Sequence, residues 1–144
     1  MQLLLFLGFL STDSIIQTHV VHEFHLLETR EEELAFIDKY QDDSDPTKLG
    51  YVCAVEMKQA EYGINPIFKY KTFVTVKQKL DELIEANPTN VHLRYVRLLL
   101  QESTPKILGY NENIEEDKCI LTEILEVNDE SDLLDDYIYK NTSL

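Results

Sequence analysis

The chain has 144 residues, of which 44% are hydrophobic and 28% are charged, and it contains only 4 Gly and 4 Pro. This composition fits one folded domain and excludes a disordered chain, and the scarcity of turn-forming Gly and Pro argues against a β-sandwich or barrel and for helices. The formal net charge of −14 disfavours nucleic acid and anionic membranes as partners, because binding to phosphates depends on Lys and Arg.

The charge is unevenly distributed along the chain. Residues 1–47 hold 10 acids and 2 bases, residues 48–110 hold 6 and 9, and residues 111–144 hold 11 and 2. The three segments therefore carry net charges of −8, +3 and −9. The basic excess of the middle segment is too sparse for a nucleic acid partner.

An apolar run, MQLLLFLGFL, forms residues 1–10. It is shorter than the roughly 20 residues of a membrane-spanning helix, so stable membrane insertion is not expected. The run is similar to the apolar core of an export signal, but no Lys or Arg precedes it and no small-residue cleavage site follows it. Two interpretations stay open. A degenerate or truncated export signal predicts a periplasmic or envelope protein, and a first helix buried in the fold predicts a cytoplasmic one.

Residues 11–144 are expected to form a single helical domain, with early helices at about 14–28, 30–41 and 46–62. Thr29 with Glu32 predicts a capping box at the start of the second helix. Asp45 before Pro46 predicts an N-cap followed by a proline in the first turn of the third, and Gly63 predicts a left-handed end to it. The residues expected to face the core are Ile16, Val20, Val21, Phe24, Leu27, Leu34, Ile37, Tyr40, Leu49, Val52, Cys53, Met57 and Ala60.

Four further helices are expected at about 66–87, 90–102, 114–127 and 132–140. Asn65 before a proline, Asn113 with Glu116, and Ser131 supply their start signals. The residues expected to face the core are Phe73, Val76, Leu80, Leu83, Ile84, Val91, Tyr95, Val96, Leu99, Leu100, Ile114, Leu121, Ile124, Leu125, Leu133, Leu134, Tyr137 and Ile138. Short loops make neighbouring helices antiparallel, so we predict six to seven helices in antiparallel hairpins, as an array or a small bundle.

The stretch KQKLDELIEANPTN, residues 77–90, resembles the second helix and closing turn of a tetratricopeptide repeat. The positions that carry this resemblance are Leu80, Leu83, Ala86 and Pro88, and the Leu49–Gly50 pair is similar to the Leu-Gly of a first helix. The hairpin of residues 46–90 is longer than the usual repeat of about 34 residues. The resemblance implies a right-handed array of helical hairpins that binds a protein or peptide.

A longer segment, about residues 46–127, is similar to a set of small, uncharacterised bacterial proteins that are helical in a tetratricopeptide-like manner and often exported. The stretch from 87 to 121 carries most of this similarity. It implies a fold and export, but no activity.

The sequence HVVHEFH contains His19, His22 and His25 around Glu23. A zinc protease needs H-E-x-x-H, whose spacing brings two imidazoles to one metal, and this chain has H-E-x-H. On a helix the three histidines lie opposite the apolar arc of Val20, so we expect all three to face solvent and to be dispensable. The alternative is a divalent metal site.

The loop TPKILGYNEN, residues 104–113, offers Tyr110, Asn111 and Asn113 as a candidate partner-binding loop for a peptide or sugar. The alternative is a simple connection in which Gly109 adopts a left-handed conformation and the last Asn caps the next helix. Cys53 and Cys119, the only cysteines, are expected either to be small buried residues or to form one disulfide.

No nucleophile elbow, nucleotide-binding glycine loop or converging carboxylate pair is present in the sequence. We therefore expect no catalytic residue, cofactor or metal, and the leading hypothesis is a non-enzymatic interaction module whose groove accepts a peptide or a partner helix. The rival hypothesis is a metal-dependent hydrolase that uses His19, His22 and His25. A third is a structural factor of the cell envelope.

Overall fold

Seven α-helices and one short 3-10 helix make up the described part of the chain, which contains no strand. In the computed structural model the described residues are 12–128 and 132–144, and the described side chains are those of 19–128 and 133–144. The helices are α1 (Thr12–His25), α2 (Arg30–Tyr40), α3 (Pro46–Glu61), α4 (Pro66–Ala86), α5 (Val91–Ser103), η1 (Lys106–Leu108), α6 (Ile114–Leu125) and α7 (Asp132–Asn141). The predicted all-α fold is confirmed. The predictions for residues 1–10, for the Ile16 side chain and for the Ser131 cap lie outside the described residues.

Three helices begin at the caps that the sequence predicts. The Thr29 hydroxyl accepts a hydrogen bond from the backbone of Glu32, whose carboxylate accepts one from the backbone of Thr29 at 2.9 Å, which completes the capping box. The side chains of Asp45 and Asn65 each accept a bond from the N–H two residues further on, at 2.9 Å. Each such cap stabilises its helix by about 1 kcal/mol.

Two other predicted helix ends are wrong. Gly63 does not adopt a left-handed conformation, since Gly109, with φ of 65°, is the one described residue with a positive φ. Asn113 precedes α6 but makes no side-chain cap. Its Oδ1 accepts instead from Nε2 of Gln101 on α5, at 3.3 Å, and its amide donates to Glu116.

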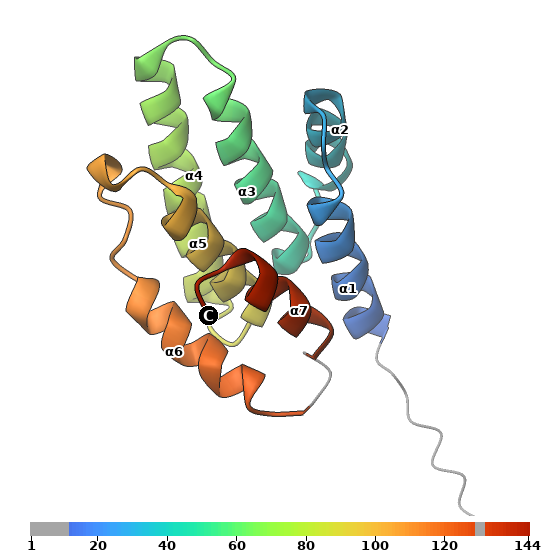
Figure 1. Ribbon diagram of the computed structural model, residues 1–144. Helices are drawn as coiled ribbons and strands as arrows, with labels where there is room; N and C mark the ends of the chain where they lie inside the picture. The colour runs from blue at the N-terminus through green and yellow to red at the C-terminus, as the bar shows by residue number, and fades with distance from the viewer. Residues whose placement is uncertain (1–11, 129–131) are drawn as a thin grey trace, which may run out of the picture.

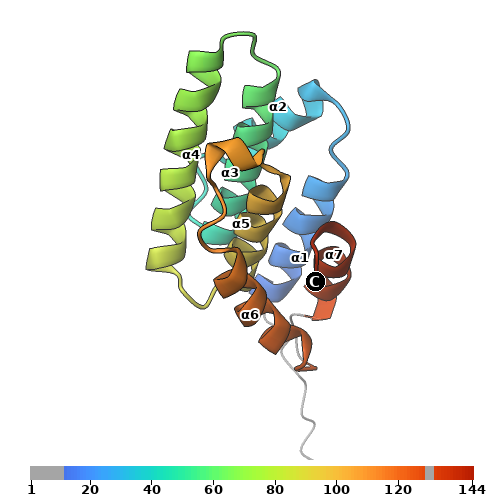
Figure 2. The same cartoon turned by 60° about the vertical axis from the view of Figure 1, so that its left-hand side comes forward.

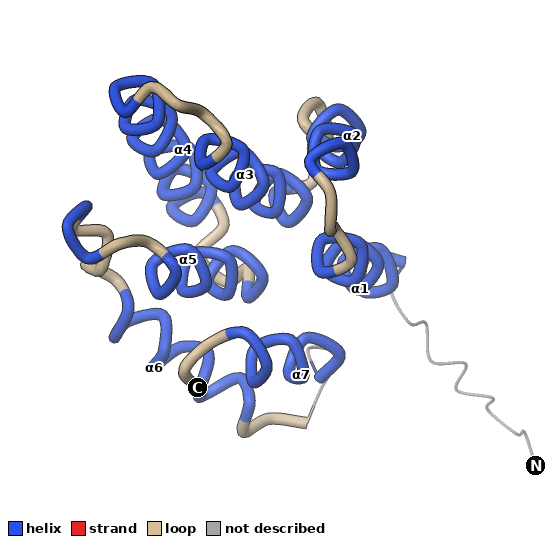
Figure 3. The backbone as a smooth tube through the Cα atoms, turned by 45° about the horizontal axis from the view of Figure 1, so that its top comes forward, coloured by secondary structure: helices blue, strands red, loops and turns tan. Residues whose placement is uncertain are grey.

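The helices are arranged in tiers around α3, which contacts α1, α2, α4 and α5 (Figures 1 and 2). Helices α3 and α4 form an antiparallel hairpin, with α2 beside α3 (Figure 1). Figure 3 shows α1 and α5 below α3, with α6 packed on α5 and α7 on both α1 and α5. The C-terminal helix therefore returns to the first helix of the described chain.

The centre of the core is the middle of α3, where every side chain from Tyr51 to Val55 is buried. Gly50 permits the close approach of α5, because a Cβ at this position would collide with the Leu93 side chain. The other buried hydrophobic residues are Val20, Val21, Phe36, Tyr40, Met57, Ala60, Phe73, Val76, Leu80, Ile84, Leu93, Tyr95, Val96, Leu98, Leu100, Tyr110, Leu121, Leu134 and Ile138.

Of the residues on α2 that are predicted to face the core, Tyr40 is buried and Ile37 packs against the core, but Leu34 does not. Leu34 is 49% exposed, whereas Glu33 is fully buried. The Glu33 carboxylate accepts hydrogen bonds from Gln59 at 2.6 Å and Tyr62 at 3.3 Å, and it forms an ion pair with Lys58. Three partners on and just after α3 thus replace the water that this carboxylate loses on burial.

Candidate functional site

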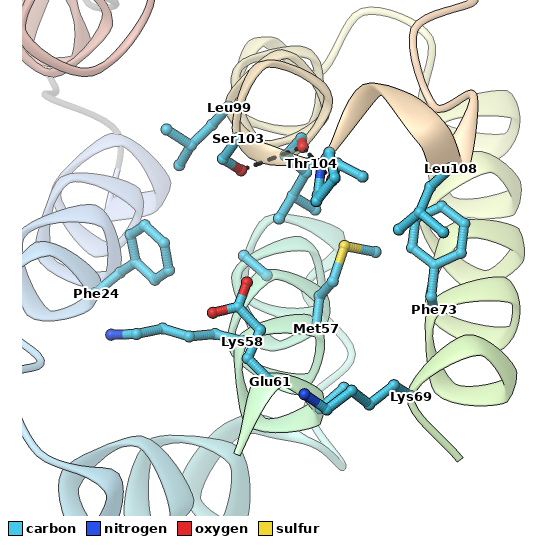
Figure 4. A pocket seen from close by; sticks show the side chains of 14 residues that line it. Phe24, Met57, Lys58, Glu61, Lys69, Phe73, Leu99, Ser103, Thr104 and Leu108 are labelled. Carbon is cyan, nitrogen blue, oxygen red and sulfur yellow. Dashed lines mark hydrogen bonds between the residues drawn. The ribbon is translucent and has the colours of Figure 1, made fainter. Parts of the chain in front are cut away.

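An apolar groove with a volume of about 550 Å³ lies over α3, between α1 on one side and α4, α5 and η1 on the other (Figure 4). We call it the α3 groove. Its lining residues are Phe24, Ala54, Met57, Lys58, Ala60, Glu61, Lys69, Phe73, Leu99, Leu100, Ser103, Thr104, Pro105 and Leu108. This volume lies in the range of sites that bind small ligands or a few anchor side chains.

The floor of the α3 groove follows from the residue sizes along α3. Ala54, Met57 and Ala60 recur every three residues, so they share one face of the helix, and two of the three are too small to fill the space above them. Phe24 closes the α1 side, and Leu108 stands beside the ring of a phenylalanine from α4 on the opposite side (Figure 4). The groove is therefore apolar on its floor and on both walls.

The rim of the α3 groove is polar. The hydroxyls of Ser103 and Thr104 donate to the carbonyl of Leu100, at 3.2 and 2.6 Å, which leaves their lone pairs free to accept (Figure 4). Lys58 is paired with a buried glutamate. Lys69 forms no ion pair with any carboxylate of the described chain, so its charge is available to an anionic group of a ligand in the groove.

Helix α7 lies on the same surface, at one end of the groove. A smaller hollow of about 240 Å³ shares Phe24, Lys58 and Leu99 with the α3 groove and reaches Asn141, the last residue of α7. Helix α7 is held by two fully buried apolar residues one turn apart, Leu134 and Ile138. Helices α1 and α5 thus already bind one amphipathic helix, α7, and the α3 groove beside it remains open.

The three histidines do not converge. His19 is exposed and approaches Glu23 at 3.7 Å, and His22 lies 2.8 Å from the Tyr137 hydroxyl. His25 is half-buried: its Nε2 lies 2.7 Å from the hydroxyl of Tyr95, and its ring stacks on that of Tyr137 at 4.8 Å. The described residues contain no group of three His, Cys, Asp or Glu side chains that could hold a metal ion.

The prediction that all three histidines face solvent is therefore wrong for His25. The polar face of α1 is covered by α7, a contact that the pattern within α1 alone does not reveal. Burial lowers the pKa of His25 to about 4, because the charged imidazolium loses water in this contact. His25 fixes the position of α7 as a neutral ring.

This environment makes one pH-dependent prediction. The pKa of His25 is about 4 in the folded chain and about 6.5 when unfolded, so as the pH falls from 6.5 to 4 only the unfolded state takes up the proton. Below about pH 6.5 the folded state should lose stability, by about 1 kcal/mol at pH 5 after allowance for partial solvent access. Between about pH 8 and pH 5, the free energy of unfolding of the variant His25→Gln should therefore fall by about 1 kcal/mol less than that of wild type.

Urea denaturation of both proteins at the two pH values measures this difference. At about pH 8 the imidazole is neutral in both the folded and the unfolded state. The difference in free energy of unfolding between wild type and variant at this pH therefore measures only the altered contact with Tyr95. An identical loss in wild type and variant would contradict the buried neutral ring.

The candidate partner-binding loop does not bring its three residues to one surface. Tyr110 is 2% exposed, and its ring packs edge-on against Phe73 at 5.6 Å. Asn111 is exposed, and Asn113 is half-buried against α5. Gly109 adopts the left-handed conformation predicted for a connecting turn. Tyr110 is part of the core rather than of a binding surface.

A buried cluster of charges joins α5 to α6. Arg97 makes a two-pronged contact with Asp117, with Nε and Nη2 each 2.7 Å from a carboxylate oxygen, and Arg94 reaches the same carboxylate at 3.2 Å. Asp117 is fully buried, and Glu116 and Asp81 complete the cluster. In the sequence, the cluster is indicated by two arginines that lie three residues apart within the mostly apolar run VHLRYVRLLL.

The two cysteines are both free, so the disulfide interpretation is wrong. Cys53 is buried and Cys119 is exposed. Burial raises the pKa of the Cys53 thiol to about 12, because the thiolate loses its water. A thiol of this kind is a packing residue rather than a nucleophile.

No protein-family model matches the chain, and no curated protein or solved structure shows a significant similarity to it. Among the described residues, no helix has the length and apolar character needed to cross a membrane. Function must therefore be argued from the geometry of the chain itself.

Proposed function

We propose that the protein is a non-enzymatic interaction module and that its α3 groove accepts an amphipathic helix from a partner protein. The observation that carries the proposal is the position of α7. An amphipathic helix of this chain already packs beside the groove, at a hollow that shares Phe24, Lys58 and Leu99 with it, and the open groove has an apolar floor and apolar walls.

The bound α7 indicates what a partner helix should look like. Leu134 and Ile138 lie four residues apart and are both buried, which is the spacing of anchors in helix-in-groove recognition. The groove floor of Ala54 and Ala60 leaves space for one or two large apolar side chains. Lys69, which has no carboxylate partner in the described chain, favours an Asp or Glu next to those anchors.

The resemblance to tetratricopeptide repeats supports the same use of the surface. The hairpin of residues 46–90, which carries that resemblance, consists of α3 and α4. A resemblance to this type of repeat implies a protein or peptide partner. Of the two other hypotheses, the metal-dependent hydrolase has no observation in its favour, because His22 and His25 contact the hydroxyls of Tyr137 and Tyr95 rather than one another.

A displayed library of amphipathic helical peptides tests the proposal, and two adjacent residues provide the variants. Leu108 lines the groove and is 39% exposed, whereas Ile107 does not line it and is 93% exposed. We expect selected peptides to carry apolar residues at helical spacing and an acidic residue. Their affinity should fall about tenfold with Leu108→Ser, because a wall contact is lost. With Ile107→Ser it should not change.

A second pair of variants tests the charge. Lys69→Glu should weaken the selected peptides, and Lys71→Glu, the same change two residues along α4 and outside the groove, should leave them unaffected. A library without enriched helical peptides, or equal effects of the two variants in each pair, would refute the groove as the binding site.

A further inference from the structure

The connection between α3 and α4 exposes a cluster of large apolar side chains. The exposed fractions are 98% for Ile64, 77% for Ile67, 58% for Phe68 and 60% for Tyr70. We call residues 62–71 the hairpin tip. In two views the tip extends beyond the ends of the neighbouring helices (Figures 1 and 2). Clustered exposed apolar side chains on a soluble chain mark an interaction surface.

The hairpin tip is locally rigid. The Asn65 side chain accepts hydrogen bonds from the N–H groups of Ile67 at 2.9 Å and Phe68 at 3.4 Å, and Pro66 occupies the first turn of α4. The hydroxyl of Tyr62 donates to a buried carboxylate at 3.3 Å, which ties the start of the tip to α2. The apolar side chains are therefore held outward by a fixed backbone rather than by a loose loop.

The charge around the tip is opposite in sign to that of the whole chain. Residues 62–80 contain four lysines and no Asp or Glu, in a chain with 27 acids. Lys77 and Lys79 are paired with Glu112 and Glu56, but Lys69 and Lys71 form no ion pair with a described carboxylate. Two uncompensated cations thus accompany the exposed apolar side chains.

The acidic C-terminal part of the chain lies far from the tip. Helices α6 and α7 are at the opposite end of the molecule from the α3–α4 connection (Figures 1 and 2). Charges in solvent are largely screened beyond about 8 Å at physiological ionic strength. Glu61 precedes the tip, and Glu56 lines a hollow together with Phe68 and Lys71 but is paired with Lys79. The first turn of α2 is acidic, and Arg30 at its start lies over the Tyr62 ring at 5.3 Å. The net charge of −14 therefore does not describe the tip.

We propose that the hairpin tip is a peripheral contact site for an anionic lipid surface. Ile64, Ile67 and Phe68 enter the boundary between headgroups and acyl chains, and Lys69 and Lys71 contact lipid phosphates. The convex shape favours lipid over a protein partner, because a deformable interface accepts a projecting wedge without a preformed pocket. This contact goes beyond the helix-binding groove, and it does not require a spanning helix.

Vesicle sedimentation of the full chain tests the site. The probes are vesicles of phosphatidylcholine with phosphatidylserine and vesicles of phosphatidylcholine alone. Wild type should sediment preferentially with the anionic vesicles. Ile64→Ser and Ile67→Ser should each reduce the partition coefficient about tenfold, since each removes a buried apolar side chain. Lys71→Gln should reduce it about fivefold at low salt and less at high salt.

Ile107→Ser is the matched control, because it makes the same change at an isoleucine that is 93% exposed and lies on η1, outside the hairpin tip. Circular dichroism should show all variants folded, since the replaced side chains are exposed. Failure of wild type to bind anionic vesicles would overturn the proposal, as would binding that the tip variants leave unchanged. Sedimentation-equilibrium detection of a dimer that Ile67→Ser dissociates, without lipid binding, would assign the tip to a second copy instead.

Discussion

Replacing Asp117 by Ala is expected to lower the free energy of unfolding by about 3–5 kcal/mol. The Asp117 carboxylate is fully buried and receives hydrogen bonds from Arg94 and Arg97, which are themselves buried. Its removal leaves two guanidinium groups out of water with only the partly exposed carboxylates of Glu116 and Asp81 near them. A chemical denaturation curve measures the loss.

The neighbouring residue supplies the control for this prediction. Glu116 contacts the same two arginines, at 3.0 and 3.3 Å, but its side chain is 52% exposed. Glu116→Ala should therefore change stability by less than about 1 kcal/mol, as for surface ion pairs. If the two variants were equally destabilised, the buried contact would not be the source of the stability.

Replacing Leu80 by Ala is expected to lower the free energy of unfolding by about 2–5 kcal/mol. Leu80 is fully buried on α4, within the hairpin that α4 forms with α3, and its truncation leaves a cavity there. Leu133 on α7 is 57% exposed, although its position in the apolar pattern predicts a core residue, so Leu133→Ala should stay within about 0.5 kcal/mol of wild type. A loss below about 0.5 kcal/mol for Leu80→Ala would contradict the burial of this face of α4.

The two proposed sites occupy different parts of the chain and can be tested independently. The α3 groove is concave and apolar, and the hairpin tip is convex and flanked by lysines. Lys69 is the residue that they share, so the variants that separate them are Leu108→Ser for the groove and Ile64→Ser for the tip. Loss of one binding activity should leave the other intact.

Most local features of this protein could be predicted from its sequence, although the predicted left-handed end at Gly63 and the predicted cap at Asn113 are wrong. The helix starts at Thr29, Asp45 and Asn65 are correct because a cap is a hydrogen bond between a side chain and a backbone group two or three residues away. The helices themselves follow from apolar periodicity, which is again a property of neighbouring residues. Gly109 was predicted as a left-handed turn for the same reason.

Tertiary contacts determined the chemistry of the buried polar groups. Glu33 and Asp117 are buried because partners from other helices, Lys58 on α3 and Arg97 on α5, replace their water. His25 is half-buried because α7, which follows α1 by more than a hundred residues in the chain, packs against it. The periodicity of one helix contains no information about which helix will cover its polar face.

The candidate sites divide in the same way. The apolar side chains of the hairpin tip follow one another in the sequence, and only their exposure had to come from the structure. The α3 groove has walls from α1, α4, α5 and η1, which no short segment contains together. It exists because Ala54 and Ala60 leave a space that the surrounding helices do not fill. The sequence by itself thus determined the helices and the caps at Thr29, Asp45 and Asn65, and long-range packing decided which surfaces remained open.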